Sequence, residues 1–376
     1  MINAVICEFN PFHNGHKYLL EKAAEKTGAE ATVCIMSGNF VQRGEGALWD
    51  KHTRAAAAVR GGADLVLQLP TAHSLSSATF FARSGVFIAN ALGVPTSLCF
   101  GSEAEDISPL FLLSQIEPGR LAESFKAAAK TGMSYAAAAQ SAYESFGTDA
   151  SILKSPNNLL AFEYIKAAKD TDLQIVNIPR VGDKHDGNSP KESFASASYI
   201  RKNISRDMSA FASGLTPPRL DRKKLEQLLL FSVYNKTAEQ LCGIADMTEG
   251  LENRFYEVSR SADSFDALCE GVKSKRYTAA KIRRTAISVL LQNPKGLYKR
   301  MPDCLRVLAF NDRGRALLKK LADTASLPVI TKPADCEKLG SLHFELECRA
   351  TDIYDFCCFD RRGGGSEYKI SPIYIK

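Results

Sequence analysis

The stretch that most constrains this chain is residues 2–20, which read INAVICEFNPFHNGHKYLL. Its first half, Ile2 to Phe9, is mostly apolar and rich in branched side chains, and this predicts a strand buried on both faces. From about Gly15 the apolar residues follow helical spacing. A buried parallel strand that turns tightly into a helix points unpaired amides and the positive end of the helix dipole at one spot, and that geometry binds phosphate. The sequence therefore predicts a phosphate-binding turn.

Two histidines lie in this turn. His13 and His16 are three residues apart at the helix start and so project to the same side. Imidazole donors that face a triphosphate can stabilise charge that builds on the α-phosphoryl group. Two alternatives stay open: the pair binds a metal, although no Cys or third His lies nearby at ligand spacing, or it caps the helix with a buried ring. Pro11 stiffens the turn, and Gly15 lets the backbone approach a ligand.

Four further strands are predicted over residues 31–36, 64–69, 96–103 and 173–180, with helical segments between them. This alternation predicts a Rossmann-like α/β fold in which five parallel strands are joined by right-handed crossovers. The polar-faced segment 105–150 is expected to add two helices that cover the site. The chain lacks the G-x-G-x-x-G pattern, which argues against a nicotinamide dehydrogenase.

Candidate ligand contacts lie where strands end, because open α/β sheets bind ligands at the carboxyl ends of their strands. Gly101 closes the fourth strand and Arg180 the fifth. Ser155 or Asn157 is expected to cap the helix that starts there. Ser198 and Arg201 begin the helix after the fifth strand; hydroxyls and helix amides there can cradle phosphate while arginine adds charge.

The loop SGNFVQRGEGALWDKH follows the second strand and is expected at the same edge of the sheet. Lys51 and Arg54 start the next helix, where their charge opposes the helix dipole. Such a basic pair is either tolerated surface charge or a pair held for an anion, and we favour the anion.

The charge is distributed unevenly along the 376 residues, a length that favours two domains. Residues 1–205 carry a net charge of −1 and residues 206–376 one of +7. This predicts a nucleotide-binding domain over 1–205, followed by a mainly α-helical basic domain over 206–376 that binds a polyanion.

Residues 271–302 contain nine Lys and Arg and neither Asp nor Glu. A solvated basic helix is one explanation, but so long an acid-free stretch favours contact with a phosphate backbone. Tyr277 offers a stacking face among the charges. The candidate RNA contacts are Lys273, Lys275, Arg276, Lys281, Arg283 and Arg284.

No apolar run approaches membrane-spanning length, and the first residues lack a signal-like pattern. The ten cysteines form no C-x-x-C pair, which favours reduced thiols in a cytoplasm. We therefore expect a cytoplasmic protein without a membrane partner, and the sequence indicates no obligate protein partner.

The run from Phe12 to His16 resembles the His-x-Gly-His signature of the nucleotidylyltransferase superfamily. The longer FNPFHNGH, with SASYIR and SKRYT…KIRR further on, resembles the bacterial tRNA(Met) cytidine acetate ligase family. This resemblance implies catalytic roles for His13, His16, Ser198 and Arg201. The residues that it places at ATP are Cys7, Glu8, Phe9, Asn10, Pro11, Phe12, His13, Asn14, Gly15, His16, Lys17, Gly101, Asn157 and Arg180.

The resemblance also implies a reaction. Acetate is activated with ATP as an acetyl-adenylate, and the wobble cytidine of elongator tRNA(Met) then receives the acetyl group; Mg²⁺ is implied by ATP. Two alternatives stay open. One is an adenylyltransferase that moves AMP onto a small phosphorylated cofactor and needs no basic helical part. The other is a non-catalytic RNA-binding factor with a decayed nucleotide site.

Overall fold

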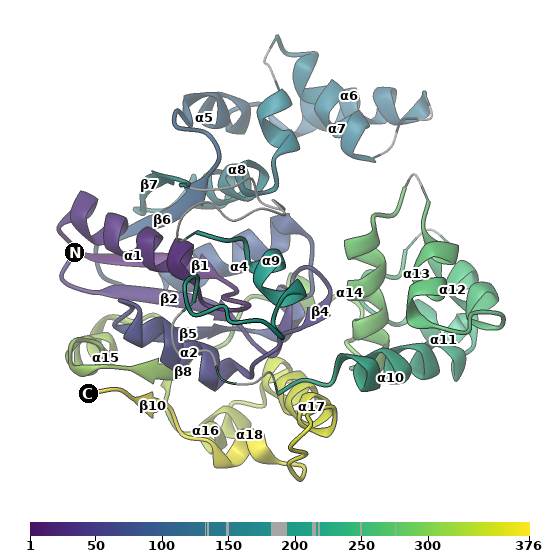
Figure 1. Ribbon diagram of the computed structural model, residues 1–376. Helices are drawn as coiled ribbons and strands as arrows, with labels where there is room; N and C mark the ends of the chain where they lie inside the picture. The colour runs from purple at the N-terminus through teal and green to yellow at the C-terminus, as the bar shows by residue number, and fades with distance from the viewer. Residues whose placement is uncertain are drawn as a thin grey trace.

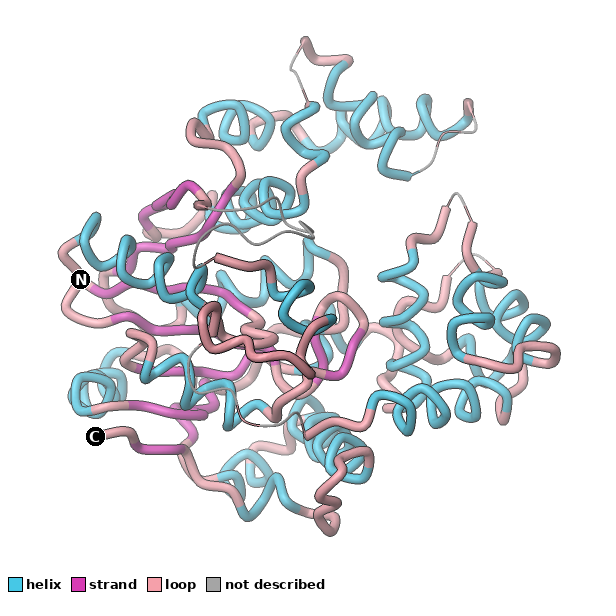
Figure 2. The backbone as a smooth tube through the Cα atoms, in the orientation of Figure 1, coloured by secondary structure: helices cyan, strands magenta, loops and turns pink. Residues whose placement is uncertain are grey.

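The computed structural model describes residues 1–131, 133, 135–147, 150–181, 194–212, 216, 219–248, 250–274 and 276–376. A mostly parallel sheet forms the centre of the protein, and helices cover both of its faces (Figure 1). The helices of residues 222–290 form a separate layer to one side of the sheet, and those of residues 108–144 lie above it in the same view (Figure 1, Figure 2).

Five neighbouring parallel strands make the main part of the sheet, as predicted. Their order is β5, β2, β1, β6, β7, so β1 is central. In the pairing of β1 with β2, Asn3 lies opposite Thr32. The central place of β1 puts the turn after it in the middle of the edge where ligands bind. The strands are β1 (Ile2–Cys7), β2 (Thr32–Ser37), β5 (Leu65–Leu69), β6 (Thr96–Ser102) and β7 (Gln174–Pro179).

The strand β1 is buried over its whole length because helices pack on both faces of the sheet. Ile2, Ala4 and Ile6 belong to one core, and Val5 and Cys7 belong to another. The first core includes residues of α4 (Ala78–Asn90), α8 (Pro156–Ala168) and α15 (Asp312–Thr324). The second includes residues of α1 (Asn14–Thr27) and α2 (Lys51–Arg60).

The sheet is larger than the five strands predicted. β8 (Leu305–Phe310) pairs antiparallel with β5 and covers its open edge. β9 (Val329–Ile330) and β10 (Ile373–Tyr374) each pair in parallel with β8. Residues 305–374 therefore return to the sheet, and the part of the chain after residue 205 is not helical throughout. A domain boundary near residue 205 stays a prediction.

The helices of residues 222–290 pack around a second hydrophobic core, to which segments outside them also contribute. Phe40, at the start of a small hairpin of β3 (Phe40–Val41) and β4 (Glu45–Gly46), belongs to this core, as does Leu346 of α17 (Leu342–Phe356). The hairpin thus joins the helical layer to the sheet. The layer consists of α10 (Arg222–Tyr234), α11 (Ala238–Cys242), α12 (Leu251–Ser259), α13 (Phe265–Val272) and α14 (Ala279–Leu290).

Where two helices were predicted between residues 105 and 150, three follow β6: α5 (Ser108–Ser114), α6 (Pro118–Lys130) and α7 (Tyr135–Glu144). Within the described ranges, every helix is too short or too polar to cross a lipid bilayer. The remaining helices are α3 (Thr71–Ser74), α9 (Ala197–Lys202), α16 (Pro333–Lys338), α18 (Ser366–Lys369) and the 3₁₀ turns η1 (Ser151–Lys154) and η2 (Leu297–Lys299).

Candidate functional site

His13 and His16 hold the start of α1. His13 is the N-cap residue, and its Nδ1 accepts a hydrogen bond from the amide of Gly15 at 3.1 Å. His16 reaches back, and its Nδ1 accepts from the amide of His13 at 3.3 Å. The two side chains form a reciprocal capping box in which imidazoles fill the roles usually taken by Ser and Glu. The alternative that these histidines cap the helix is confirmed.

The amides of the first helical turn are occupied. The amide of Asn14 donates to the carbonyl of Phe211 at 2.8 Å. The amides of His16 and Lys17 donate to the carbonyl of His13 at 2.8 and 3.1 Å. The prediction of unpaired amides that face a phosphate is therefore wrong, because the capping box and the segment around Phe211 take these donors.

The capping hydrogen bonds fix the tautomer of both rings. Because each Nδ1 accepts, the proton of each neutral ring is on Nε2. Burial, with the nearby charges of Arg180 and Arg201, lowers the pKa of His13 to about 3. Burial, His13 and Arg180 lower the pKa of His16 well below its usual value. Both imidazoles are therefore neutral at pH 7, and each has one donor, Nε2–H.

Ring packing and one glycine shape the turn. The His13 and His16 rings stack with their centroids 3.7 Å apart, and the His16 ring lies 4.7 Å from that of Phe9 and 5.8 Å from that of Phe12. A Cβ on Gly15 would lie 2.9 Å from Cε1 of His13. Glycine at this place lets the His13 ring fold over the first turn, which gives the His-x-Gly-His spacing a physical reason.

Arg201 and Ser198 reach the same turn from α9. Nη1 of Arg201 donates to the carbonyl of Asn10 at 2.7 Å, and Nη2 donates to Oγ of Ser198 at 3.4 Å. Arg43 donates to the same hydroxyl oxygen at 3.0 Å. The structure thus brings Ser198 and Arg201 to the turn that carries the two histidines, although the two pairs lie far apart in the sequence.

The residues before the histidines hold the turn against neighbouring segments. Sγ of Cys7 donates to the carbonyl of Ile35 at 3.7 Å, and burial raises the pKa of its thiol. Oδ1 of Asn10 accepts from the amide of Leu48 at 3.1 Å. Burial also raises the pKa of Glu8. Contacts of these side chains with ATP stay predictions.

Pro11 is buried in the turn, whereas Lys17 is exposed one residue beyond His16. Nζ of Lys17 lies 3.7 Å from a carboxylate oxygen of Glu21, one turn further along α1. The charge of Lys17 is therefore at the protein surface and shared with a neighbour on its own helix. A contact between Lys17 and ATP stays a prediction.

Lys51 and Arg54 have structural partners, and the prediction that they bind an anion is wrong. Lys51 is 1% exposed, and its Nζ lies 2.8 Å from Oε1 of Glu347 and 2.6 Å from Oε2 of Glu367. The buried guanidinium of Arg54 donates to backbone carbonyls at the ends of β1 and β2, namely those of Glu8, Ser37 and Gly38. Internal acceptors therefore use both charges.

Gly101 and Arg180 lie side by side where β6 and β7 end. The amide of Arg180 donates to the carbonyl of Ser102 at 3.0 Å, and a Cβ on Gly101 would lie 3.4 Å from Cγ of Arg180. The side chain of Arg180 is exposed, and its charge acts on both histidines. This places Arg180 at the same edge of the sheet as the turn.

Asn157 lies in the first turn of α8. Its Nδ2 donates to a carboxylate oxygen of Glu103, which follows β6. The N-cap residue of α8 is Ser155, so of the two predicted caps Ser155 is confirmed and Asn157 is wrong. Glu103 instead ties Asn157 to the end of β6, close in sequence to Gly101.

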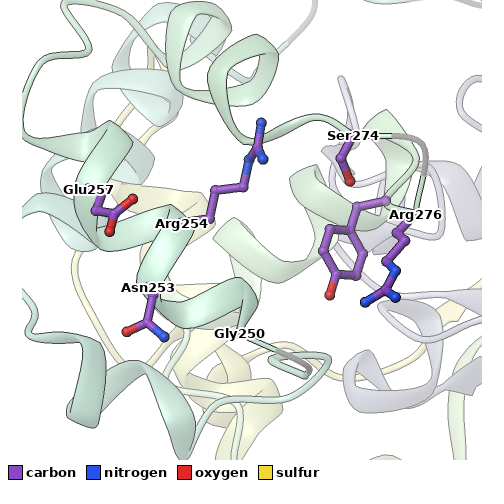
Figure 3. A pocket seen from close by; sticks show the side chains of 7 residues that line it. Gly250, Asn253, Arg254, Glu257, Ser274 and Arg276 are labelled. Atoms are coloured by element: carbon purple, nitrogen blue, oxygen red, sulfur yellow. The ribbon is translucent and has the colours of Figure 1, made fainter.

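The predicted RNA contacts are partly exposed. Lys273 and Arg276 are exposed just before α14. Arg276 and Arg254 line an open cavity of about 480 Å³ in the helical layer, where both side chains carry positive charge (Figure 3). Lys275 lies outside the described residues.

The other candidate residues of this region contact neighbouring parts of the protein. Tyr277 is 8% exposed and belongs to the core of the helical layer, so the prediction of a stacking face there is wrong. Nζ of Lys281 donates to Oγ1 of Thr248 at 3.2 Å. Arg284 is 12% exposed, and its Nη1 donates to the carbonyl of Gln42 at 2.9 Å. The charge of Arg284 is thus directed at the β3–β4 hairpin.

Sequence reasoning missed Glu45 in that hairpin. Its Oε2 lies 3.5 Å from Nε of Arg201, and its Oε1 lies 3.8 Å from Nη1 of Arg283. The available signal was the glycine on each side of it: Gly44 has a φ of +77° and so forms a turn that places Glu45. The pairing with two arginines from distant segments had no local signal.

A capped strand-to-helix turn with two neutral imidazoles, at the carboxyl end of a central parallel strand, defines a nucleotide-binding α/β protein of the His-x-Gly-His class. The profile of the HIGH Nucleotidyl Transferase family matches residues 1–364. The fold and this family match therefore indicate the same class of protein.

Known proteins of this kind extend over the whole chain. A tRNA(Met) cytidine acetate ligase of Thermoanaerobacter sp. is 36% identical over 380 residues, which cover 94% of each chain, and one of Clostridium perfringens is 35% identical over 404 residues, which cover 100% of each. The apo crystal structure of Thermotoga maritima TmcAL is 30% identical and covers 100% of this chain and 99% of its own, with a TM-score of 0.92. A second structure of that protein, bound with α-thio ATP, has a TM-score of 0.89 at 29% identity, with the same coverage.

The chain belongs to the HIGH nucleotidyltransferase family and, within it, to the tRNA(Met) cytidine acetate ligases. The family predicted from the sequence motifs is thereby confirmed.

Proposed function

We propose that this protein is an ATP-dependent ligase that activates acetate as acetyl-adenylate and acetylates N4 of the wobble cytidine of elongator tRNA(Met). The observation that carries the proposal is the pair of neutral imidazoles fixed as Nε2 donors beside Arg201. Relatives that match the whole chain are tRNA(Met) cytidine acetate ligases, and a structural neighbour binds an ATP analogue, which supports the same reaction.

In the first half-reaction a carboxylate oxygen of acetate attacks the α-phosphorus of ATP. The bond from that phosphorus to the bridging oxygen breaks, and pyrophosphate leaves with the electron pair. Nε2–H of His13 and of His16 donates to phosphate oxygens as negative charge shifts onto them. Arg201 and Ser198 steady the leaving pyrophosphate. Neutral imidazoles serve here as donors and transfer no proton.

A Mg²⁺ ion would enter the site with ATP and would need no dedicated cage of protein ligands. Among the described residues no three His, Cys, Asp or Glu side chains are grouped to hold a metal. Mg²⁺ bound to ATP takes most of its ligands from phosphates and water and needs one or two carboxylates at most. It would neutralise charge on the outer phosphates.

In the second half-reaction the exocyclic amine of cytidine attacks the acetyl carbonyl carbon. The carbon–oxygen bond to the phosphate breaks, AMP leaves, and the amine loses a proton as the amide forms. Exposed basic residues before and along α14 hold the tRNA backbone. Lys273 and Arg276 are exposed, and the side chain of Arg283 is 36% exposed.

The test combines purified protein, ATP, Mg²⁺, ¹⁴C-acetate and an elongator tRNA(Met) transcript. Expected products are AMP, pyrophosphate and labelled N4-acetylcytidine after digestion of the tRNA. The control transcript carries uridine at the wobble position and receives no label. Pyrophosphate release that needs neither acetate nor tRNA would support the adenylyltransferase alternative. Binding of tRNA without any binding of ATP would support the non-catalytic RNA-binding factor.

A further inference from the structure

The β3–β4 hairpin is pressed against the basic helix α14. A Cβ on Gly44 would lie 2.6 Å from Cβ of Arg283 and 2.7 Å from the amide nitrogen of Arg284, so the two backbones are in direct contact. Arg284 also donates to the carbonyl of Gln42 at 2.9 Å. Figure 1 shows β4 between the sheet and α14. A displacement of α14 would therefore move the hairpin directly, because no other segment lies between them at Gly44.

The same hairpin contacts the candidate nucleotide site. The amide of Gln42 donates to a carboxylate oxygen of Glu8, at the end of β1. Arg43 donates to Oγ of Ser198 at 3.0 Å. A carboxylate oxygen of Glu45 lies 3.5 Å from Nε of Arg201. Two of these three contacts thus connect the hairpin with residues proposed to hold pyrophosphate, Ser198 and Arg201, and the third connects it with the end of β1.

Glu45 is shared between the two sides. Its second carboxylate oxygen lies 3.8 Å from Nη1 of Arg283. The exposed fractions of the side chains are 9% for Arg201, 18% for Glu45 and 36% for Arg283. One partly buried carboxylate therefore lies between an arginine of the nucleotide site and an arginine of the RNA-binding helix. Partial burial keeps this electrostatic competition from being fully screened by salt.

We propose that Glu45 is a positioning residue that couples tRNA binding to the nucleotide site, an inference that rests on the proposed function. When the phosphates of ATP draw Arg201 away, Glu45 holds Arg283 back from the tRNA backbone. When tRNA draws Arg283 away, Glu45 holds Arg201 and weakens its grip on pyrophosphate. By thermodynamic linkage each ligand weakens the other by the same factor. Adenylate formation therefore precedes firm tRNA binding, and tRNA promotes release of pyrophosphate.

The experiment measures the affinity for an elongator tRNA(Met) transcript with and without α,β-methylene ATP and Mg²⁺. Glu45→Gln is compared with wild type and with Glu226→Gln. Glu226 lines the same cavity of about 150 Å³ as Glu45, so its substitution makes the same change of charge nearby. In wild type and in Glu226→Gln, the nucleotide should weaken tRNA binding at least about fivefold. In Glu45→Gln this effect should vanish. Each ligand alone should bind more tightly because Glu45 no longer competes with it for Arg201 or Arg283, while the ion pair of Arg283 with Asp266 at 3.8 Å is the same in both proteins.

The outcomes separate this inference from the function on which it rests. Wild type that binds neither ATP analogue nor tRNA overturns the proposed function itself. Wild type that binds both ligands independently, or more tightly together, overturns the coupling alone. If Glu45→Gln keeps the fivefold effect, the coupling does not depend on Glu45 and the inference is wrong. Weaker binding of both ligands by that variant would make Glu45 a structural residue and also refute the inference.

Discussion

His13 caps α1 through Nδ1 and is proposed to donate to phosphate through Nε2–H. One substitution separates these two roles. In His13→Asn, Oδ1 is the same number of bonds from the backbone as Nδ1 and can accept from the amide of Gly15, so the cap is retained. The variant has no group in place of Nε2–H. If this donor stabilises charge on the α-phosphoryl group, the variant keeps its fold and loses its chemistry.

The two contributions differ in size. Removal of one preorganised donor to a developing charge costs about 10²–10³-fold in rate. Loss of an N-cap side chain costs about 1 kcal/mol of stability, which lowers the Tm of a protein of this size by about 1–2 °C. We expect His13→Asn to form acetyl-adenylate about 10²–10³-fold more slowly than wild type at an unchanged Tm. His13→Ala should show the same loss of rate together with a lower Tm.

The assay is acetate-dependent pyrophosphate release at saturating ATP, measured beside thermal unfolding of each variant. It needs no tRNA, so the result does not depend on the RNA-binding surface. A His13→Asn enzyme within about threefold of the wild-type rate would refute the donor role. His13 would then be a helix cap that the signature retains for structure alone.

Three further predictions concern stability and RNA binding. Lys51→Met leaves the buried carboxylate of Glu347 without its counter-ion and leaves that of Glu367 with Arg306 alone. It should lower the free energy of unfolding in urea by about 3–5 kcal/mol, and a loss below about 1 kcal/mol would contradict a buried network. The Lys273→Ala, Arg276→Ala double variant should reduce the slope of log K for tRNA against log salt by about 1–2, whereas removal of an exposed lysine from α15 should leave it unchanged. Because burial lowers the pKa of His13 to about 3 and of His52 to about 4, the unfolded chain binds more protons than the folded one below about pH 6.5. The free energy of unfolding should therefore fall from pH 7 to pH 5, by up to about 1.4 kcal/mol per pH unit for each histidine, and a flat profile would contradict neutral burial.

The inner strands β1, β2, β5 and β6 were predictable because they are buried almost throughout and so are mostly apolar, whereas the edge strand β7 is only partly buried. The predicted strand over residues 64–69 corresponds to β5, for example, and the one over 173–180 to β7. The His-x-Gly-His turn was predictable for a similar reason. The two capping hydrogen bonds of its imidazoles join residues no more than three positions apart, so local sequence is sufficient to define these two bonds.

What the sequence could not reveal depends on distant partners. Lys51 begins a helix like a surface residue would, yet its carboxylate partners follow almost 300 positions later. The amide of Asn14 donates to the carbonyl of Phe211, a contact that no local sequence pattern predicts. The arginines of α14 are alike in sequence, and only the packing of Gly44 against the helix directs Arg284 inward.

The antiparallel pairing of β5 with β8 has a consequence during synthesis. About 235 residues separate the end of β5 from the start of β8, which at ribosomal speeds corresponds to roughly 10–50 s. During this interval the apolar edge of β5 has no neighbour and is a template for strands of other nascent chains. The longer synthesis takes to reach β8, the longer this edge stays open to pairing with other chains.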